Sequence, residues 1–114
     1  MNTTEHLLTC LGEEGSEVAQ DVAKALRFGL DDLNVLNPTG PTNRERIVME
    51  LNDLFAVMDM LIERKIIPAD WCDPTRTHEK RMKVEKFLDY ARSVGALSDN
   101  GPDQGRRASD SKQP

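Results

Sequence analysis

The chain has 114 residues, of which 38% are hydrophobic, 31% are charged and only 4% are aromatic. This length supports one domain, and a core built mostly from Leu, Val, Ile, Met and Ala suits helices. The net charge of −5 argues against a general nucleic-acid binder, because such proteins need a basic face for phosphates. The two cysteines have no close spacing and no partner histidine, so we expect neither a zinc site nor a disulfide framework.

The sequence contains no candidate membrane span, because a transmembrane helix needs about 20 consecutive apolar residues. The most apolar stretch, residues 54–62, is short and contains Asp59. The N-terminus carries Glu5 and His6, whereas a signal peptide has a basic start followed by an apolar core. We therefore expect a cytoplasmic protein that has no membrane partner and does not bind nucleic acid stably.

The first predicted helix begins after Asn2, which forms a capping-box pattern with Glu5 three residues later. Gly29 is expected to end it. Residues 30–43 contain two prolines and predict a loop, whose length suggests a substrate lid or a dimer element. The expected buried stripe of this helix has apolar or small residues at helical spacing: Leu8, Leu11, Gly15, Val18, Val22 and Leu26.

Two further helices are predicted. Thr42 and Glu45 form a second capping-box pattern, and Pro68 ends the helix that follows. A third helix is expected from near Thr77 to Val94, with Gly95 as its left-handed cap. The expected buried stripe of the second helix comprises Ile47, Leu51, Leu54, Met58 and Ile62.

The predicted fold class is all-α, since no strand pattern competes with these helices. Residues 1–97 are predicted to form one domain, a small helical bundle. Three helices in about 95 residues bury too little apolar surface alone, so we expect the bundle to be completed by dimerisation. Residues 98–114 contain no apolar residue larger than Ala108 and predict a disordered C-terminal tail.

Acidic pairs flank the predicted buried stripes of the first two helices. At about 100° per residue, Glu14 and Glu17 fall roughly 60–120° to one side of the first stripe, and Glu50 and Asp53 fall on the same side of the second. Two such pairs would repel each other unless a cation lay between them. Carboxylates without a nearby His or Cys suit Mg²⁺, with Mn²⁺ as a substitute. The alternative is that they are solvated surface acids, which are common on helices.

Three residues are candidates for binding a substrate. Lys24 lies on the same side of its helix as Glu17 and could reach a phosphate. Lys83 belongs to a basic cluster on the third helix. The alternative is that this cluster is an ordinary solvated face. Trp71 could stack on a base, although a lone tryptophan in a connection more often anchors packing.

The two acidic motifs resemble those of a known superfamily. Residues 13–17 (EEGSE) followed by residues 50–53 (ELND) resemble the E-E-x-x-E … E-x-x-D motif of the all-α nucleoside triphosphate pyrophosphohydrolases, the MazG-like group. The segment AKALRFG at 23–29 is similar to short single-domain members from bacteria and phages. The resemblance covers residues 4–97, and the 32 residues between Glu17 and Glu50 make a long connection for this motif pair.

This resemblance implies a helical bundle that is a homodimer or homotetramer and a Mg²⁺ ion held by Glu14, Glu17, Glu50 and Asp53. It implies cleavage of a nucleoside triphosphate between the α and β phosphates, which yields a monophosphate and pyrophosphate and serves nucleotide pool control or sanitation. The four ligands, with Glu13 as a carboxylate that orients water, would be catalytic: a metal-bound water would attack in line, and one carboxylate would take its proton.

Two other functions stay open. The first is a non-enzymatic acidic helical dimer that acts as an adaptor or regulator. The second is an enzyme of the same superfamily that acts on a phosphoribosyl-ATP-like substrate. Convergence of the four carboxylates on one point would favour an enzyme, and their divergence would favour the adaptor.

Overall fold

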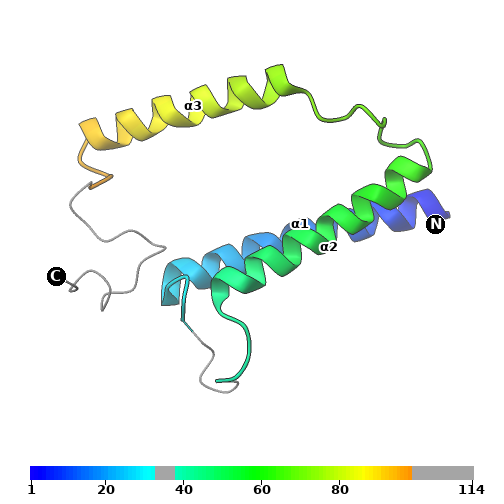
Figure 1. Ribbon diagram of the computed structural model, residues 1–114, viewed down its shortest axis with the longest axis horizontal. Coiled ribbons are helices and arrows are strands. Elements are labelled where there is room, and N and C mark those ends of the chain that lie inside the picture. The colour runs from blue at the N-terminus through cyan, green and yellow to red at the C-terminus, as the bar shows by residue number, and fades with distance from the viewer. Residues whose placement is uncertain (33–37, 99–114) are drawn as a thin grey trace. The chain divides into compact units, whose positions relative to one another are not determined.

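The computed structural model describes residues 1–32 and 38–98. These residues form three helices and no β-strand, which confirms the predicted all-α class: α1 (Thr3–Phe28), α2 (Asn43–Glu63) and α3 (Pro74–Ser93) (Figure 1). None of these helices has a stretch that is both long and apolar enough to cross a membrane. The predicted tail, apart from Ser98, lies outside the described residues.

The predicted starts of the first two helices are confirmed by their capping boxes. The Asn2 side chain accepts a hydrogen bond from the Glu5 backbone N–H at 2.8 Å, and the Glu5 carboxylate accepts one from the Asn2 backbone N–H at 3.2 Å. Thr42 and Glu45 make the same reciprocal pair at 3.1 and 3.2 Å. Gly29 ends α1 with φ 99°, a conformation that side chains rarely adopt.

Helix α3 begins at Pro74, three residues earlier than predicted. The Asp73 side chain accepts hydrogen bonds from the backbone N–H groups of Thr75 and Arg76, and proline fits the first helical position because it has no N–H to satisfy. The predicted Gly95 cap is confirmed, since this residue has φ 78° and its N–H bonds back to the Arg92 carbonyl at 3.1 Å.

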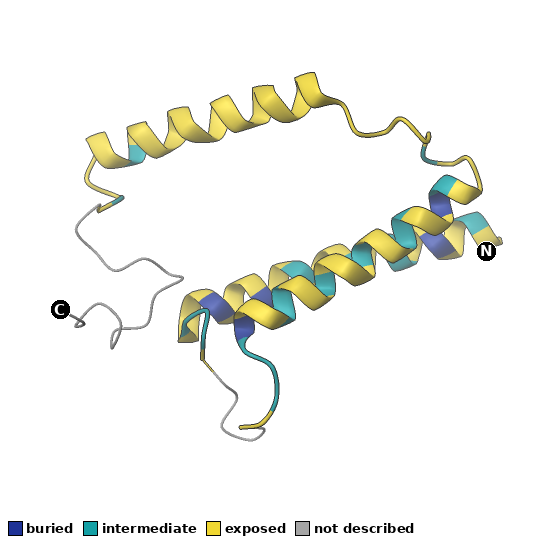
Figure 2. Cartoon of the chain, in the orientation of Figure 1, coloured by how far each residue is buried: buried dark blue, intermediate teal, exposed yellow. Residues whose placement is uncertain are grey.

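The described residues divide into two units, one within residues 1–67 and the other over residues 68–98. The first unit is a hairpin in which α1 and α2 run in opposite directions and pack against each other (Figure 1). The second unit contains α3, whose residues are all exposed except the half-buried Ala91 (Figure 2). The single domain over residues 1–97 stays a prediction.

The contact between α1 and α2 is a seam whose residues alternate in steps of four and three, as in a coiled coil. The seam residues are all buried or half-buried, whereas the outer surfaces of both helices are exposed (Figure 2). Acidic side chains interrupt this otherwise largely apolar seam. The seam residues are Leu7, Leu11, Glu14, Val18, Asp21 and Ala25 on α1, and Asn43, Ile47, Glu50, Leu54, Val57 and Leu61 on α2.

The predicted buried stripes are therefore wrong in part. Leu11 and Val18 are half-buried in the seam, but Leu8 and Leu26 are 45% and 67% exposed, and Leu51 on α2 is exposed as well. The physical reason is that carboxylates occupy seam positions and displace the centre of each apolar stripe from the contact by roughly 60–70°. On both helices the apolar stripe is rotated away from the seam in the same sense about the helix axis. Because the helices are antiparallel, this places both stripes on one side of the hairpin, and the carboxylates lie on the other side.

Just after α2 the chain contains a left-handed residue that is not glycine. Lys65 has φ 60°, and its N–H bonds to the Ile62 carbonyl at 2.9 Å. A residue with a side chain is strained in this conformation by about 1–2 kcal/mol. Glycine removes this strain, but its greater entropy in the unfolded state offsets part of the gain in stability. We expect Lys65→Gly to raise the free energy of unfolding by about 0.5–1 kcal/mol, measured by urea denaturation. Lys65→Ala keeps the strained conformation and should give no gain; an equal gain from both variants would contradict this explanation.

Candidate metal centre

Carboxylates from both helices converge at the middle of the seam. Glu14 of α1 and Glu50 and Asp53 of α2 each offer one oxygen, and these three oxygens all lie within 4.8 Å of one another. Glu14 and Glu50 face each other because both occupy seam positions, and Asp53 is one helical turn beyond Glu50. Ligands at about 2.1 Å from one Mg²⁺ lie at most about 4.2 Å apart, so a small contraction would bring these oxygens onto one ion.

Two of these carboxylates have an oxygen that the protein does not satisfy. Glu14 Oε2 and Glu50 Oε2 are buried and have no hydrogen-bond partner in the described part of the chain. A carboxylate oxygen removed from water without a donor or a cation is unfavourable. A divalent cation between α1 and α2 would supply the missing partner for both oxygens.

The pKa values of Glu14 and Glu50 are both raised. For Glu14 the largest cause is burial, followed by the negative charges of Glu17 and Asp53. For Glu50 the pKa rises to about 7, mainly because Glu17 is close enough to share a hydrogen bond with a protonated Glu50, and then because of burial. Without a cation, the cluster therefore tends to keep a proton, because a fully ionised set of carboxylates would repel one another.

The raised pKa of Glu50 predicts that the metal-free protein loses stability as the pH rises. Glu50 titrates at 4.5 in the unfolded chain and at about 7 in the fold, so the folded state binds more protons between these values. The resulting stabilisation is fully present below pH 4.5 and is lost as the pH rises through 7. In EDTA, we expect the thermal midpoint of the wild type to fall between pH 5 and pH 8, relative to Glu50→Gln. A wild type that gains stability relative to this variant over the same range would contradict the shift.

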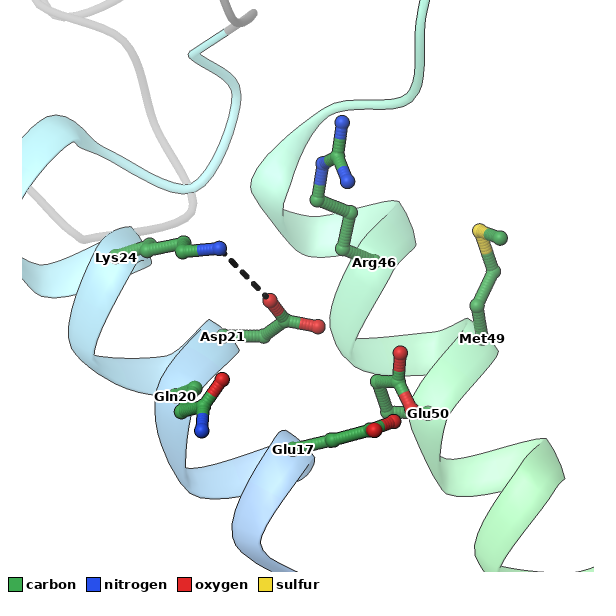
Figure 3. Close-up of a pocket in the computed structure, with 7 residues that line it drawn as sticks. All are labelled: Glu17, Gln20, Asp21, Lys24, Arg46, Met49 and Glu50. Atoms are coloured by element: carbon green, nitrogen blue, oxygen red, sulfur yellow. Dashed lines mark ion pairs between the residues drawn. The ribbon is translucent and has the colours of Figure 1, made fainter. Parts of the chain in front are cut away.

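The other predicted acids of the first motif lie outside the close cluster. Glu17 is exposed, but its carboxylate lies beside that of Glu50 on the facing helix (Figure 3). Glu13 is exposed and is not one of the three residues whose oxygens converge. Glu17 is therefore placed beside the cluster. Its role as a metal ligand and the catalytic role of Glu13 stay predictions.

A polar pocket of about 290 Å³ adjoins the cluster. It is open to solvent, and side chains from both helices line it (Figure 3): Glu17, Gln20, Asp21, Lys24, Arg46, Met49 and Glu50. Lys24 lies there as predicted, with its ammonium 4.0 Å from the buried Asp21 carboxylate. The pocket thus has carboxylates at one end and basic side chains at the other.

Two predicted substrate-binding residues belong to the second unit. Trp71 lies in the segment before α3 and Lys83 lies on α3, and both side chains are exposed. Either is accessible to a ligand, and their roles stay predictions.

Arg46 is a basic pocket residue that the sequence analysis missed. It precedes Glu50 by four residues, which places the two side chains on the same side of α2. That spacing was the available signal, but a lone arginine in the first turns of a helix is ordinary in a chain with so many charges. The fold is what places Arg46 across from Lys24 on the facing helix (Figure 3).

Comparison of the chain with models of known protein families, with curated proteins and with solved structures gives no match.

Proposed function

We propose that this protein is a Mg²⁺-dependent nucleoside triphosphate pyrophosphohydrolase of the MazG-like type. The observation that carries the proposal is the convergence of Glu14, Glu50 and Asp53 from two separate helices, with buried oxygens that a cation would satisfy. Surface acids without a function would be expected to point to solvent and to separate from one another. The order and spacing of the two acidic motifs support the same function.

The residues of the cluster divide the work of hydrolysis. Glu14, Glu50 and Asp53 would hold the ion, which supplies Lewis-acid activation of a phosphate and lowers the pKa of a bound water. Glu17 is exposed at the edge of the pocket, beside Glu50, so its carboxylate can accept the proton of the attacking water. Nucleophile and leaving group would lie in line, because phosphoryl transfer depends mainly on positioning and charge stabilisation.

The second part of the proposal is that the active form is a homodimer or a dimer of dimers. The hairpin exposes apolar side chains on the side opposite the carboxylates, among them Leu8, Leu26, Leu51 and Phe55. Phe87 and Leu88 of α3 are exposed as well. Contiguous apolar surface on a small domain marks an interaction site, and a second copy of the chain would complete the bundle.

The test is an assay of product formation across a panel of nucleotides. Canonical and modified nucleoside triphosphates and phosphoribosyl-ATP are incubated with and without Mg²⁺, and the products are identified by phosphorus NMR. We expect metal-dependent release of pyrophosphate together with a nucleoside monophosphate. Turnover of phosphoribosyl-ATP alone would favour the alternative enzyme, which acts on a phosphoribosyl-ATP-like substrate.

Absence of turnover would contradict the enzymatic function only if the protein is shown to be folded. Circular dichroism establishes the helices, and calorimetry with Mg²⁺ and Mn²⁺ establishes whether the carboxylates bind a cation. A folded protein that neither hydrolyses the panel nor binds either ion would support the adaptor.

A further inference from the structure

The pocket beside the carboxylate cluster has a basic end that the proposed metal centre does not use. Figure 3 shows Glu17 and Glu50 meeting at one end of the pocket, and Lys24 and Arg46 at the other, one on each helix. Asp21 lies between them and pairs with Lys24 at a long distance of 4.0 Å. The pocket is therefore divided by charge along the direction of the seam.

Arg46 differs from the other arginines of the hairpin in its environment. It is half-buried, and its guanidinium forms no hydrogen bond or ion pair with any residue in the described ranges. Arg44, only two residues away, makes a two-point contact with Asp31 at 3.0 and 3.2 Å. The guanidinium of Arg46 thus keeps its planar set of donors available on the wall of a pocket, where it can bind an oxyanion at two points.

We propose that Arg46, assisted by Lys24, forms a phosphate subsite that holds a non-reacting phosphate of the substrate about one helical turn from the carboxylate cluster. This inference rests on the proposed function and assigns the pocket's basic end to the polyphosphate chain. Arg46 is the principal donor, because Lys24 is partly neutralised by Asp21. A ligand with a single isolated phosphate would reach only one end of the pocket, so the subsite favours polyphosphates.

Calorimetry with pyrophosphate and tripolyphosphate tests the subsite without requiring turnover. In saturating Mg²⁺, we expect Arg46→Gln to weaken binding of both probes by about 10- to 100-fold, the usual range for losing a charge-assisted hydrogen-bonding group. Arg46→Lys should recover part of this loss, and Lys24→Gln should cost less than Arg46→Gln. Arg27→Gln is the matched control, because Arg27 is exposed on α1 and its guanidinium lies 5.2 Å from the Phe28 ring.

The Mg²⁺ affinity of each variant, measured without phosphate, separates the subsite from the metal centre. If Arg46 is a phosphate ligand, the Mg²⁺ affinity of Arg46→Gln stays within about twofold of the wild type while the probes bind more weakly. Equal probe binding by Arg46→Gln and the wild type, or loss only in step with Mg²⁺ affinity, would overturn the subsite. A wild type that binds no Mg²⁺ would instead refute the proposed function.

Discussion

Replacing Glu50 by glutamine is expected to lower kcat/KM for nucleoside triphosphate hydrolysis by about a thousandfold, because charge stabilisation by a metal ion is a major source of rate enhancement in phosphoryl transfer. Glu50 belongs to the converging cluster, has a buried oxygen without a partner and lies beside Glu17. Glutamine keeps its shape but removes the charge that would attract the ion. Steady-state kinetics of pyrophosphate release, with Mg²⁺ varied, measure the effect.

The same variant should fold at least as well as the wild type in EDTA at pH 8, because it removes an electrostatic repulsion. A thermal midpoint equal to or above that of the wild type therefore shows that lost activity does not come from misfolding. Glu63→Gln is the matched control, since Glu63 is an exposed acid at the end of the same helix. Glu50→Gln activity within about tenfold of the wild type would remove this residue from the catalytic centre.

The second large effect concerns the apolar side of the hairpin. Leu51 is 39% exposed and lies on the side opposite the carboxylates. In a symmetric dimer, Leu51→Asp would place two unpaired carboxylates in one interface, so we expect dissociation to become easier by about a hundredfold or more. Sedimentation velocity across a range of protein concentrations measures the shift from dimer to monomer.

Met60→Asp provides the control for that experiment. Met60 lies on the same helix with 48% exposure, but rotation along α2 places it on the side of Asp53. It should leave the oligomeric state unchanged. Dissociation by both substitutions would indicate general destabilisation, and dissociation by neither would contradict an interface on the apolar side.

The helices could be predicted from the sequence because their ends depend on local chemistry. The Asn2–Glu5 and Thr42–Glu45 boxes each involve residues three apart, so no knowledge of the tertiary fold is needed to recognise them. Helix α3 begins earlier than the predicted position near Thr77, because Asp73 caps it. Helix ends can therefore move by a turn wherever two residues offer competing caps.

The facing surfaces of the helices could not be predicted from apolar spacing alone. A search for apolar stripes assigns burial to Leu8 and Leu26, whereas the seam passes through Glu14 and Asp21. Sequence reasoning treats a carboxylate as a surface residue, because burying it is costly without a partner. Two of the positions where this rule fails, Glu14 and Glu50, belong to the candidate metal centre, which agrees with the tendency of functional sites to violate folding preferences.

The residues of the candidate site could be predicted from the sequence, but the relative positions of their side chains could not. The motif spacing identified Glu14, Glu50 and Asp53, and the fold brings their oxygens together. The separation of Glu17 from the closest group and the position of Arg46 depend on how far each helix is rotated about its axis. A rotation of about 50° moves a side chain from the seam to solvent, and apolar periodicity does not fix helix orientation that closely.

Titration with Mn²⁺, followed by electron paramagnetic resonance, tests most directly whether the carboxylates of α1 and α2 form a metal centre. We predict saturable binding by the wild type, displacement of Mn²⁺ by Mg²⁺, and loss of this binding in both Glu14→Gln and Glu50→Gln. These two variants remove one carboxylate from each helix, so a shared site must be affected by both. A folded wild type that leaves the free Mn²⁺ signal unchanged, or two variants that bind Mn²⁺ as the wild type does, would contradict the proposed centre.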